Sequence, residues 1–440
     1  MRKNGKTSVA GKFKIILFML LLALLSTNSF AGEYPIDLQK AGRYFENLKK
    51  YCDRDGGQLW GENLWAPILI IDRKTRFVVA NQADKEGLLK KERNVYIGRF
   101  PADQNIANST TRFGGKLWTM LMYPLPKKEY NRYQLGIHEL YHFWQNKNNL
   151  DFSNYNNEHM DKMNARILVK LEWSALEEAI LNEKEIRKHI KAALIFRKYR
   201  RLLYPEKVAM ESEFEIHEGL AEYTGYKICA NNERDYVNNI MENKDMYWNS
   251  RSYVRSFAYY SGILYGYILD KKTDDWNYNI NPESDLGSLA LKNYKIKLPH
   301  NIKQSYEKLR ENYDYAKIYQ VEETRKRKQQ EKIQEYITKF TQESVLILET
   351  KKPKVAFNPR TLIPLDTLGT VYPTIKIISE WGKLYVKKGG CLFNWKRAIV
   401  SAKNLEQTGQ QIIGQGWHLE LEDNWELFQI DSNYKLRKVR

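Results

Sequence analysis

The periodicity of the apolar residues changes twice along this 440-residue chain, so the fold must combine helices with strands. Between Leu59 and about Tyr123, short segments such as WAPILIIDRKTRFVVANQ are rich in branched and aromatic residues and predict a small, largely antiparallel sheet. From Asn131 to about Cys229, and again in SYVRSFAYYSGILYGYILD, the pattern is helical. We therefore expect an α+β fold.

The last third of the chain predicts two further segments. The charged stretch from Ile302 to about Gln342 predicts one long exposed helix. Beyond Ser344, short runs such as TVYPTIKIIS and GWHLELEDNWEL are separated by Pro and Gly and predict a compact all-β domain. The expected organisation is a signal peptide at 1–31, a mainly helical domain with the small sheet at 32–300, a helical linker at 301–344 and a β-rich domain at 345–440.

The N-terminus has the composition of an export signal. The segment MRKNGKTSVAGKFK carries five Lys and Arg residues and no acidic residue, and it precedes the apolar run IILFMLLLALL and the small residues of STNSFAGE. The apolar run is too short to predict a membrane span. We expect cleavage after Ala31 and a secreted or periplasmic protein.

The chain is basic, with 71 Lys and Arg residues against 53 Asp and Glu residues, a formal charge of +18. Its densest basic run, Arg325 to Lys328, is interleaved with Glu322, Glu323 and Glu331, which is typical of a solvated helix face. We therefore expect no nucleic-acid partner, whereas the net charge is compatible with association with an anionic cell envelope. The three scattered cysteines predict neither a disulfide scaffold nor a Cys-ligated metal site.

The segment GIHELYHFW contains the candidate chemistry. Residues four apart share a helix face, so His138 and His142 can direct their imidazoles at one ion while Glu139 lies beside it. The alternative is an ordinary helix with two histidines near the surface. A catalytic zinc usually takes three protein ligands, so the metal interpretation requires another ligand nearby.

The segment EIHEGLAEYTGY offers that ligand. Glu218 can supply the third ligand, and Glu222, one turn later, can accept the N–H of a ligating histidine and define its tautomer. His217 is a competing ligand, and the alternative is a pair of solvated carboxylates. The small and apolar neighbours of Glu218 favour a packed face. Cys229, after this segment, is interpreted as a packed residue.

HELYH followed by HEGLAEY resembles the gluzincins, zinc peptidases in which a second helix supplies a glutamate ligand. The family commonly has Asn before that glutamate, where this chain has His217, and 75 residues separate His142 from Glu218 here, far more than in the aminopeptidases of the family. We expect the insertion to form a helical hairpin. Residues 51–270 also resemble uncharacterised bacterial secreted proteins classed as metallopeptidases.

The resemblance implies a zincin-like metallopeptidase at 32–300 that uses Zn²⁺ held by His138, His142 and Glu218. In that mechanism Glu139 is the general base for hydrolysis of a peptide or protein substrate. Tyr259 or Tyr265, with Arg255 behind them, is the candidate donor to the oxyanion.

The strand FGGKLWTMLMYPLP precedes the HExxH helix, as does the edge strand on which gluzincins bind an extended peptide. The alternative function is a catalytically silent cell-envelope binding protein on a zincin scaffold, with the C-terminal β domain as its working surface. The presence of Glu139 favours the hydrolase. The sequence carries no signal for a particular oligomeric state.

Overall fold

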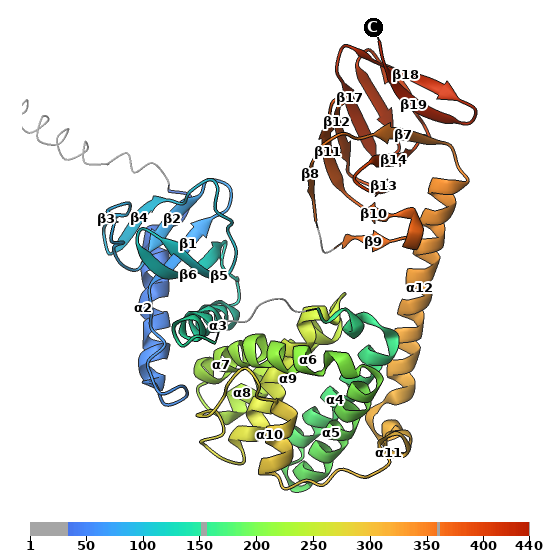
Figure 1. Ribbon diagram of the computed structural model, residues 1–440. Helices are drawn as coiled ribbons and strands as arrows, with labels where there is room; N and C mark the ends of the chain where they lie inside the picture. Colours follow the sequence, from blue (N-terminus) through green and yellow to red (C-terminus); the bar gives the residue numbers. More distant parts are fainter. Residues whose placement is uncertain (1–33, 151–155, 359–360, 440) are drawn as a thin grey trace, which may run out of the picture. The chain divides into compact units, whose positions relative to one another are not determined.

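A computed structural model describes residues 34–150, 156–358 and 361–439 of the chain (Figure 1). The predicted signal peptide falls on residues 1–31, which lie outside the described residues. The chain divides into two compact units, one extending to Ala316 and the other running from Lys317 to Arg440. This division falls inside the segment that was expected to link two domains.

The first unit contains a six-stranded sheet in the order β3-β4-β2-β1-β6-β5. Neighbouring strands are antiparallel except for β1 and β6, which are parallel, so the expected largely antiparallel sheet is present. The strand expected at the edge, β6, is instead flanked by β1 and β5, because the preceding segment STTRF pairs with it as a hairpin and becomes the edge. The strands are β1 (Ile68–Asp72), β2 (Phe77–Ala80), β3 (Lys90–Glu92), β4 (Val95–Arg99), β5 (Ser109–Phe113) and β6 (Lys116–Tyr123).

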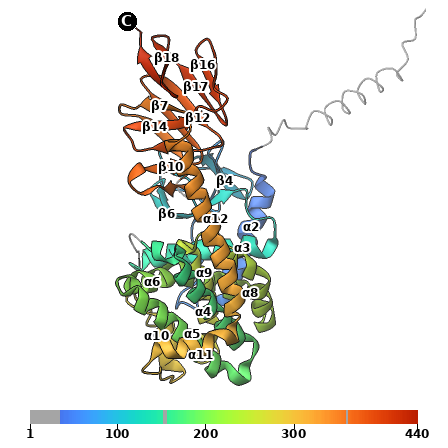
Figure 2. The same cartoon turned by 90° about the vertical axis from the view of Figure 1, so that its right-hand side faces the viewer.

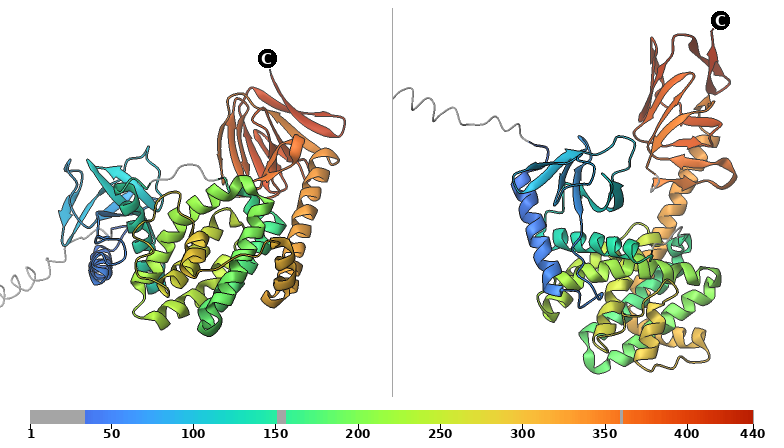
Figure 3. Two further views of the ribbon diagram at one scale, coloured as in Figure 1. Left: turned by 60° about the horizontal axis from the view of Figure 1, so that its bottom comes forward. Right: turned by 60° about the vertical axis from the view of Figure 1, so that its left-hand side comes forward.

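The sheet has a buried apolar core because alternate residues of its strands face the same side. Leu69 and Ile71 of β1, Val78 of β2 and Trp118 of β6 are fully buried in this cluster. Helix α2 (Leu38–Asp55) begins at Asp37, whose side chain accepts from the backbone N–H of Lys40, and it contacts both β4 and α3. Figure 3 shows α2 as the long helix at the start of the described chain.

Helices form the remainder of the first unit. Helices α4 and α5 pack along each other as the expected hairpin, and α9 lies against α4 and α7 (Figure 1). Short 3₁₀ or π turns separate several of these helices. The α-helices are α3 (Glu129–Lys147), α4 (Met163–Leu181), α5 (Ile186–Leu203), α6 (Val208–Phe214), α7 (Leu220–Cys229), α8 (Glu233–Trp248), α9 (Tyr253–Asp270), α10 (Leu286–Asn293) and α11 (Ile302–Leu309).

The expected single helix from 302 to 342 is wrong in one respect. Helix α11 ends in a 3₁₀ turn, Asp314 adopts a left-handed conformation with φ 57°, and α12 (Tyr315–Thr341) begins after it. Aspartate tolerates that conformation better than most residues, so the chain changes direction there.

The second unit consists of most of α12 and two sheets (Figure 2). One sheet has the order β18-β19-β7-β14-β13-β10-β9 and the other β15-β16-β17-β12-β11-β8. Their facing residues, including Trp381, Leu384 and Val400, form one core. The strands are β7 (Val345–Glu349), β8 (Lys354–Phe357), β9 (Ile363–Pro364), β10 (Thr370–Tyr372), β11 (Ile375–Ser379), β12 (Gly382–Val386), β13 (Cys391–Phe393), β14 (Arg397–Ser401), β15 (Glu406–Thr408), β16 (Gln411–Gly414), β17 (Trp417–Leu421), β18 (Trp425–Ile430) and β19 (Asn433–Lys438).

The α+β fold class is therefore confirmed, with a helical middle and a sheet-rich C-terminal part. Within the described ranges, none of the helices is long and apolar enough to cross a membrane.

Candidate metal centre

Three side chains from two helical segments converge at one point. His138 and His142 lie one turn apart on α3, and Glu218 lies in the π-helical turn Glu215–Gly219 that precedes α7. The two Nε2 atoms are 3.1 Å apart, and Glu218 Oε2 lies 3.6 Å from that of His138 and 3.5 Å from that of His142. Ligand atoms about 2.0–2.1 Å from a tetrahedral ion are about 3.3 Å from one another, so this triangle has the size of a zinc site.

The other nitrogen of each imidazole is occupied, which defines the tautomers. His138 Nδ1 lies 2.6 Å from Glu222 Oε2, and His142 Nδ1 lies 2.7 Å from Gln145 Oε1. Gln145 Nε2 donates to the carbonyls of Ile216 and His217, so its oxygen is the atom that faces His142. Both Nδ1 atoms therefore carry the proton, and in the neutral histidines both Nε2 lone pairs point into the triangle.

Three electron-pair donors facing one another require a positive charge between them. In the protein alone that charge is a proton: burial opposes protonation of His138, but its hydrogen bonds to Glu218 and Glu222 outweigh burial and raise its pKa well above the usual value. Burial would likewise raise the pKa of Glu218, yet the two histidines hold it far below its usual range. A divalent cation satisfies the same requirement, so the residues fit a metal ion.

Glu139 lies beside this triangle, and one oxygen of its carboxylate is buried without a hydrogen-bonding partner in the described part of the chain. Its side chain is 5% exposed, and its Oε2 atom makes no hydrogen bond to any of the described residues. Burial raises the pKa of its carboxyl and outweighs the opposing effect of His138 and His142. A buried carboxylate that is not satisfied by the protein is suited to accept a proton from a molecule bound next to it.

Close contact between helices places Glu218 opposite the histidines. A Cβ atom added at Gly262 of α9 would lie 2.2 Å from the carbonyl oxygen of Gly219, the residue after Glu218. On the other side of α7, a Cβ at Gly225 would lie 2.7 Å from the backbone oxygen of Gln134 in α3. Only glycine permits these approaches, so α7 is held between α3 and α9.

Helix α9 contributes two polar side chains to the centre. Arg255 Nη2 donates to Glu218 Oε1 at 2.7 Å, leaving Oε2 directed at the histidines. The ring of Tyr259 stacks on that of His138 with centroids 5.8 Å apart, and its hydroxyl lies 3.5 Å from Arg255. Burial and the charge of Glu218 raise the pKa of Tyr259, so its hydroxyl remains a donor.

Tyr265, the second candidate donor, does not reach this centre, and that part of the sequence interpretation needs correction. Its hydroxyl donates to Glu172 at 2.8 Å within a fully buried ionic cluster. Tyr265 lies six residues after Tyr259 on the same helix, which corresponds to a rotation of about 240°. The two side chains therefore leave α9 in different directions. The cluster nevertheless supports the site, because Arg197 pairs with Glu215 at the start of the turn that carries Glu218.

His217, the competing ligand, is not part of the triangle. Its ring lies beside His142, with centroids 4.6 Å apart, and burial together with the charge of His142 lowers its pKa to about 3. Cys229 is a buried free thiol, as are the other two cysteines.

Two residues of the site were missed by the sequence interpretation. Gln145 is three residues after His142 on the same helix, a spacing that could have suggested a contact. Tyr247 of α8 donates to Glu222 Oε1 at 2.6 Å, and no local pattern signals that contact because the two residues are 25 positions apart. Gln145 orients His142 directly, and Tyr247 holds the Glu222 carboxylate that orients His138.

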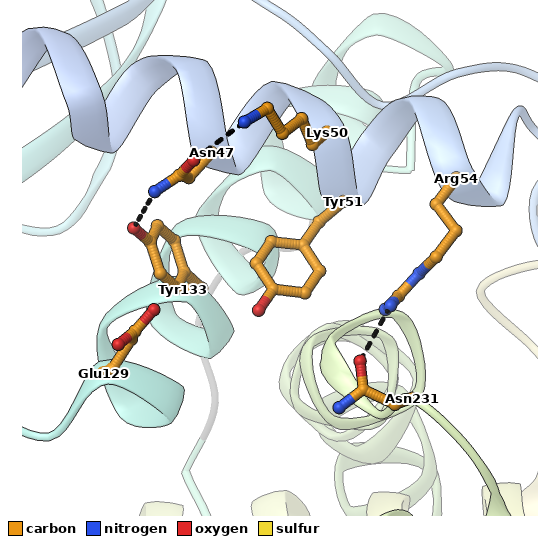
Figure 4. Close-up of a pocket in the computed structure, with 7 residues that line it drawn as sticks. All are labelled: Asn47, Lys50, Tyr51, Arg54, Glu129, Tyr133 and Asn231. Atoms are coloured by element: carbon orange, nitrogen blue, oxygen red, sulfur yellow. Dashed lines mark hydrogen bonds between the residues drawn. The ribbon is translucent and has the colours of Figure 1, made fainter.

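A separate hollow lies where α2, α3 and the end of α7 meet (Figure 4). Tyr51 lies between Tyr133 and Arg54, with ring centroids 5.2 Å from Tyr133 and the guanidinium carbon 5.0 Å from its ring. Arg54 donates to the carbonyl of Ala230 just after α7, so it caps that helix. The triad does not line this hollow; the seven lining residues are Asn47, Lys50, Tyr51, Arg54, Glu129, Tyr133 and Asn231.

Comparisons with protein-family models, with curated proteins and with solved structures found no match to this chain.

Proposed function

We propose that the protein is an exported zinc-dependent hydrolase of the gluzincin type that cleaves peptide bonds. The observation that carries this proposal is the triangle of His138, His142 and Glu218, which directs three electron pairs at one point, with a buried carboxylate oxygen of Glu139 beside it that has no partner among the described residues. Export is inferred from the composition of residues 1–31 alone.

Two imidazoles and one carboxylate form a ligand set that suits zinc and leaves a position open for substrate or water. A zinc ion held there would lower the pKa of a water molecule and polarise the substrate carbonyl. The protein's own contribution is to hold the ligands in place: Glu222 and Gln145 orient the imidazoles, and Arg255 occupies the second oxygen of Glu218.

Glu139 is assigned as the general base. Its buried carboxylate accepts a proton from the attacking water and then delivers it to the leaving amine. Because burial raises its pKa, the carboxyl is a better proton acceptor than an exposed glutamate, which assists the first transfer. Tyr259 is assigned as the donor that stabilises the negative charge on the carbonyl oxygen.

An extended substrate has a strand to pair with. Strand β5 is one of the two edge strands of the first sheet, and both β5 and β6 contact α3, the helix that carries the two histidines. The free edge of β5 offers backbone groups for strand addition, so substrate binding is assigned to Ser109–Phe113 in place of β6.

The test measures metal and cleavage together. The purified protein, its Glu139→Gln variant and a Glu206→Gln control at an exposed position are analysed for metal by mass spectrometry, and each is incubated with a mixed peptide library. We expect about one zinc per chain in all three and cleavage by all except Glu139→Gln. Zinc without cleavage by any protein would support the silent binding protein, and absence of zinc from all three would refute the metal centre.

A further inference from the structure

The turn between β13 and β14 presents an exposed tryptophan in a conformation that rarely suits one. Trp395 is 54% exposed and has φ 68°, in the left-handed region. Glycine and asparagine adopt this region readily, whereas a bulky residue is strained there. Local strain at a surface position is a recurrent property of binding sites.

The turn is nevertheless rigidly built. Asn394 Oδ1 accepts from the backbone N–H groups of Lys396 and Arg397, at 3.2 and 2.9 Å. The carbonyl of Trp395 accepts from Thr350 Oγ1 at 3.0 Å, and the Thr350 N–H donates to the carbonyl of Lys396. The buried ring of Phe393 packs against the indole with centroids 5.4 Å apart. The indole is therefore held outward by a defined structure.

Three exposed lysines lie in this turn and in the turn that is hydrogen-bonded to it. Lys351 and Lys352 follow Thr350 in the neighbouring turn, and Lys396 follows Trp395. Lys352 is itself left-handed, with φ 46°. We call Lys351, Lys352, Trp395 and Lys396 the Trp395 patch.

The charge of the surrounding region has the same sign. Residues 345–440 contain 15 Lys and Arg residues and 9 Asp and Glu residues. Two exposed acids lie near the patch: Glu349 pairs across the strands with Arg397, and Glu380 follows Ser379, whose hydroxyl accepts from the Lys351 N–H. The three lysines outnumber these two acids, one of which faces an arginine.

We propose that the Trp395 patch docks on a bilayer surface containing anionic phospholipids. An indole is stable at the boundary between headgroups and acyl chains, and lysines around it contact lipid phosphates while their stems cover apolar surface. Three lysines near such a surface, together with one inserted aromatic side chain, support reversible binding.

The shape of the patch favours a bilayer over a nucleic acid or a glycan. Binding of single-stranded nucleic acid uses successive stacking platforms along a basic groove. Here, within the described part of the two C-terminal sheets and their turns, the exposed aromatic side chains are Trp395, at 54%, and Phe357 of β8, at 37%, and the Phe357 ring packs edge-on against Tyr372. The one indole among these rings, with three exposed lysines in the same two turns, matches a planar anionic surface.

The test is cosedimentation of the full chain with vesicles of phosphatidylcholine alone or with 30% phosphatidylglycerol. We expect binding only to the anionic vesicles, weakened as salt is raised from 50 to 500 mM. Trp395→Gly, which relieves the left-handed strain, should fold at least as well as the parent and bind about tenfold more weakly. Combined charge reversal of Lys351, Lys352 and Lys396 to Glu should weaken binding by about 100-fold or more.

The matched control reverses the charge of three exposed lysines near the other end of β12, Lys387, Lys388 and Lys403. This variant should keep most of the binding to anionic vesicles. Equal binding to both vesicle types, equal loss in the control and patch variants, or full binding by Trp395→Gly would each overturn the proposal. So would patch-dependent binding to single-stranded DNA or heparin with no binding to vesicles.

Discussion

Replacing Gly262 with alanine tests whether helix packing determines the geometry of the candidate metal centre. The added Cβ would lie 2.2 Å from the carbonyl oxygen of Gly219, about 1.2 Å short of the 3.4 Å at which ordinary contact begins. The obstacle is backbone, so α9 and the turn carrying Glu218 must separate by roughly that distance. Overpacking of this kind costs about 1–3 kcal/mol, and we expect the upper end because no side chain can rotate away.

The shift should affect metal binding more than the fold. Ligand distances in metal sites vary by only about 0.2 Å, whereas the carboxylate next to Gly219 would move by about 1 Å. We expect zinc affinity to fall by at least about 100-fold, measured by competition with a chromophoric chelator at a temperature where circular dichroism shows the variant folded.

Gly98→Ala provides the matched control. Its Cβ would meet the Leu89 side chain at 2.7 Å and the Leu88 carbonyl at 2.9 Å, in the sheet of the same unit, so it should reduce the free energy of unfolding without changing zinc affinity. Parental zinc affinity in Gly262→Ala, accompanied by reduced stability, would refute the argument that this crossing positions Glu218.

Three further perturbations have defined outcomes. Tyr247→Phe removes the hydrogen bond to Glu222 and should lower zinc affinity about tenfold with little change in thermal stability; an unchanged affinity would deny Tyr247 an orienting role. Arg200→Met leaves two buried carboxylates, Glu172 and Glu211, without one of their cations. It should lower the free energy of unfolding in urea by about 3–5 kcal/mol, and a decrease below about 1 kcal/mol would contradict this expectation. Burial raises the pKa of Glu211, but the charge of Arg200 outweighs burial and places the pKa in the folded state below the ordinary 4.5. The unfolded state therefore binds more protons, and the free energy of unfolding should decrease as the pH falls below about 4.5. Acid titrations followed by circular dichroism would measure this decrease.

Much of the site could be located from local spacing. His138 and His142 are four residues apart, and so are Glu218 and Glu222, which places each pair on one helix face before any tertiary contact is considered. Tyr259 and Tyr265 could not be separated in this way, because both belong to one apolar helical run. Packing against α4 directs Tyr265 to Glu172, whereas Tyr259 faces α3.

The edge strand was misassigned for a related reason. The segment STTRF before Gly114 has few apolar residues, so β5 carries a weak strand signal. Its pairing with β6 is a contact between two segments, which the hydrophobic pattern does not register. The break at Asp314 was likewise not visible in a charged run of uniform helical composition.

The helical and β-rich segments and the two pairs of candidate site residues could be read from the chain alone, because they follow from periodicities of two and 3.6 residues. Tertiary contacts were needed to show that His138 is the histidine that meets Glu222, that Gln145 and Tyr247 orient the site, and that Tyr265 belongs elsewhere. The physical reason is that such contacts depend on how closely helices approach, and here that approach is set by glycines at 219, 225 and 262 whose importance appears only once their neighbours are in place.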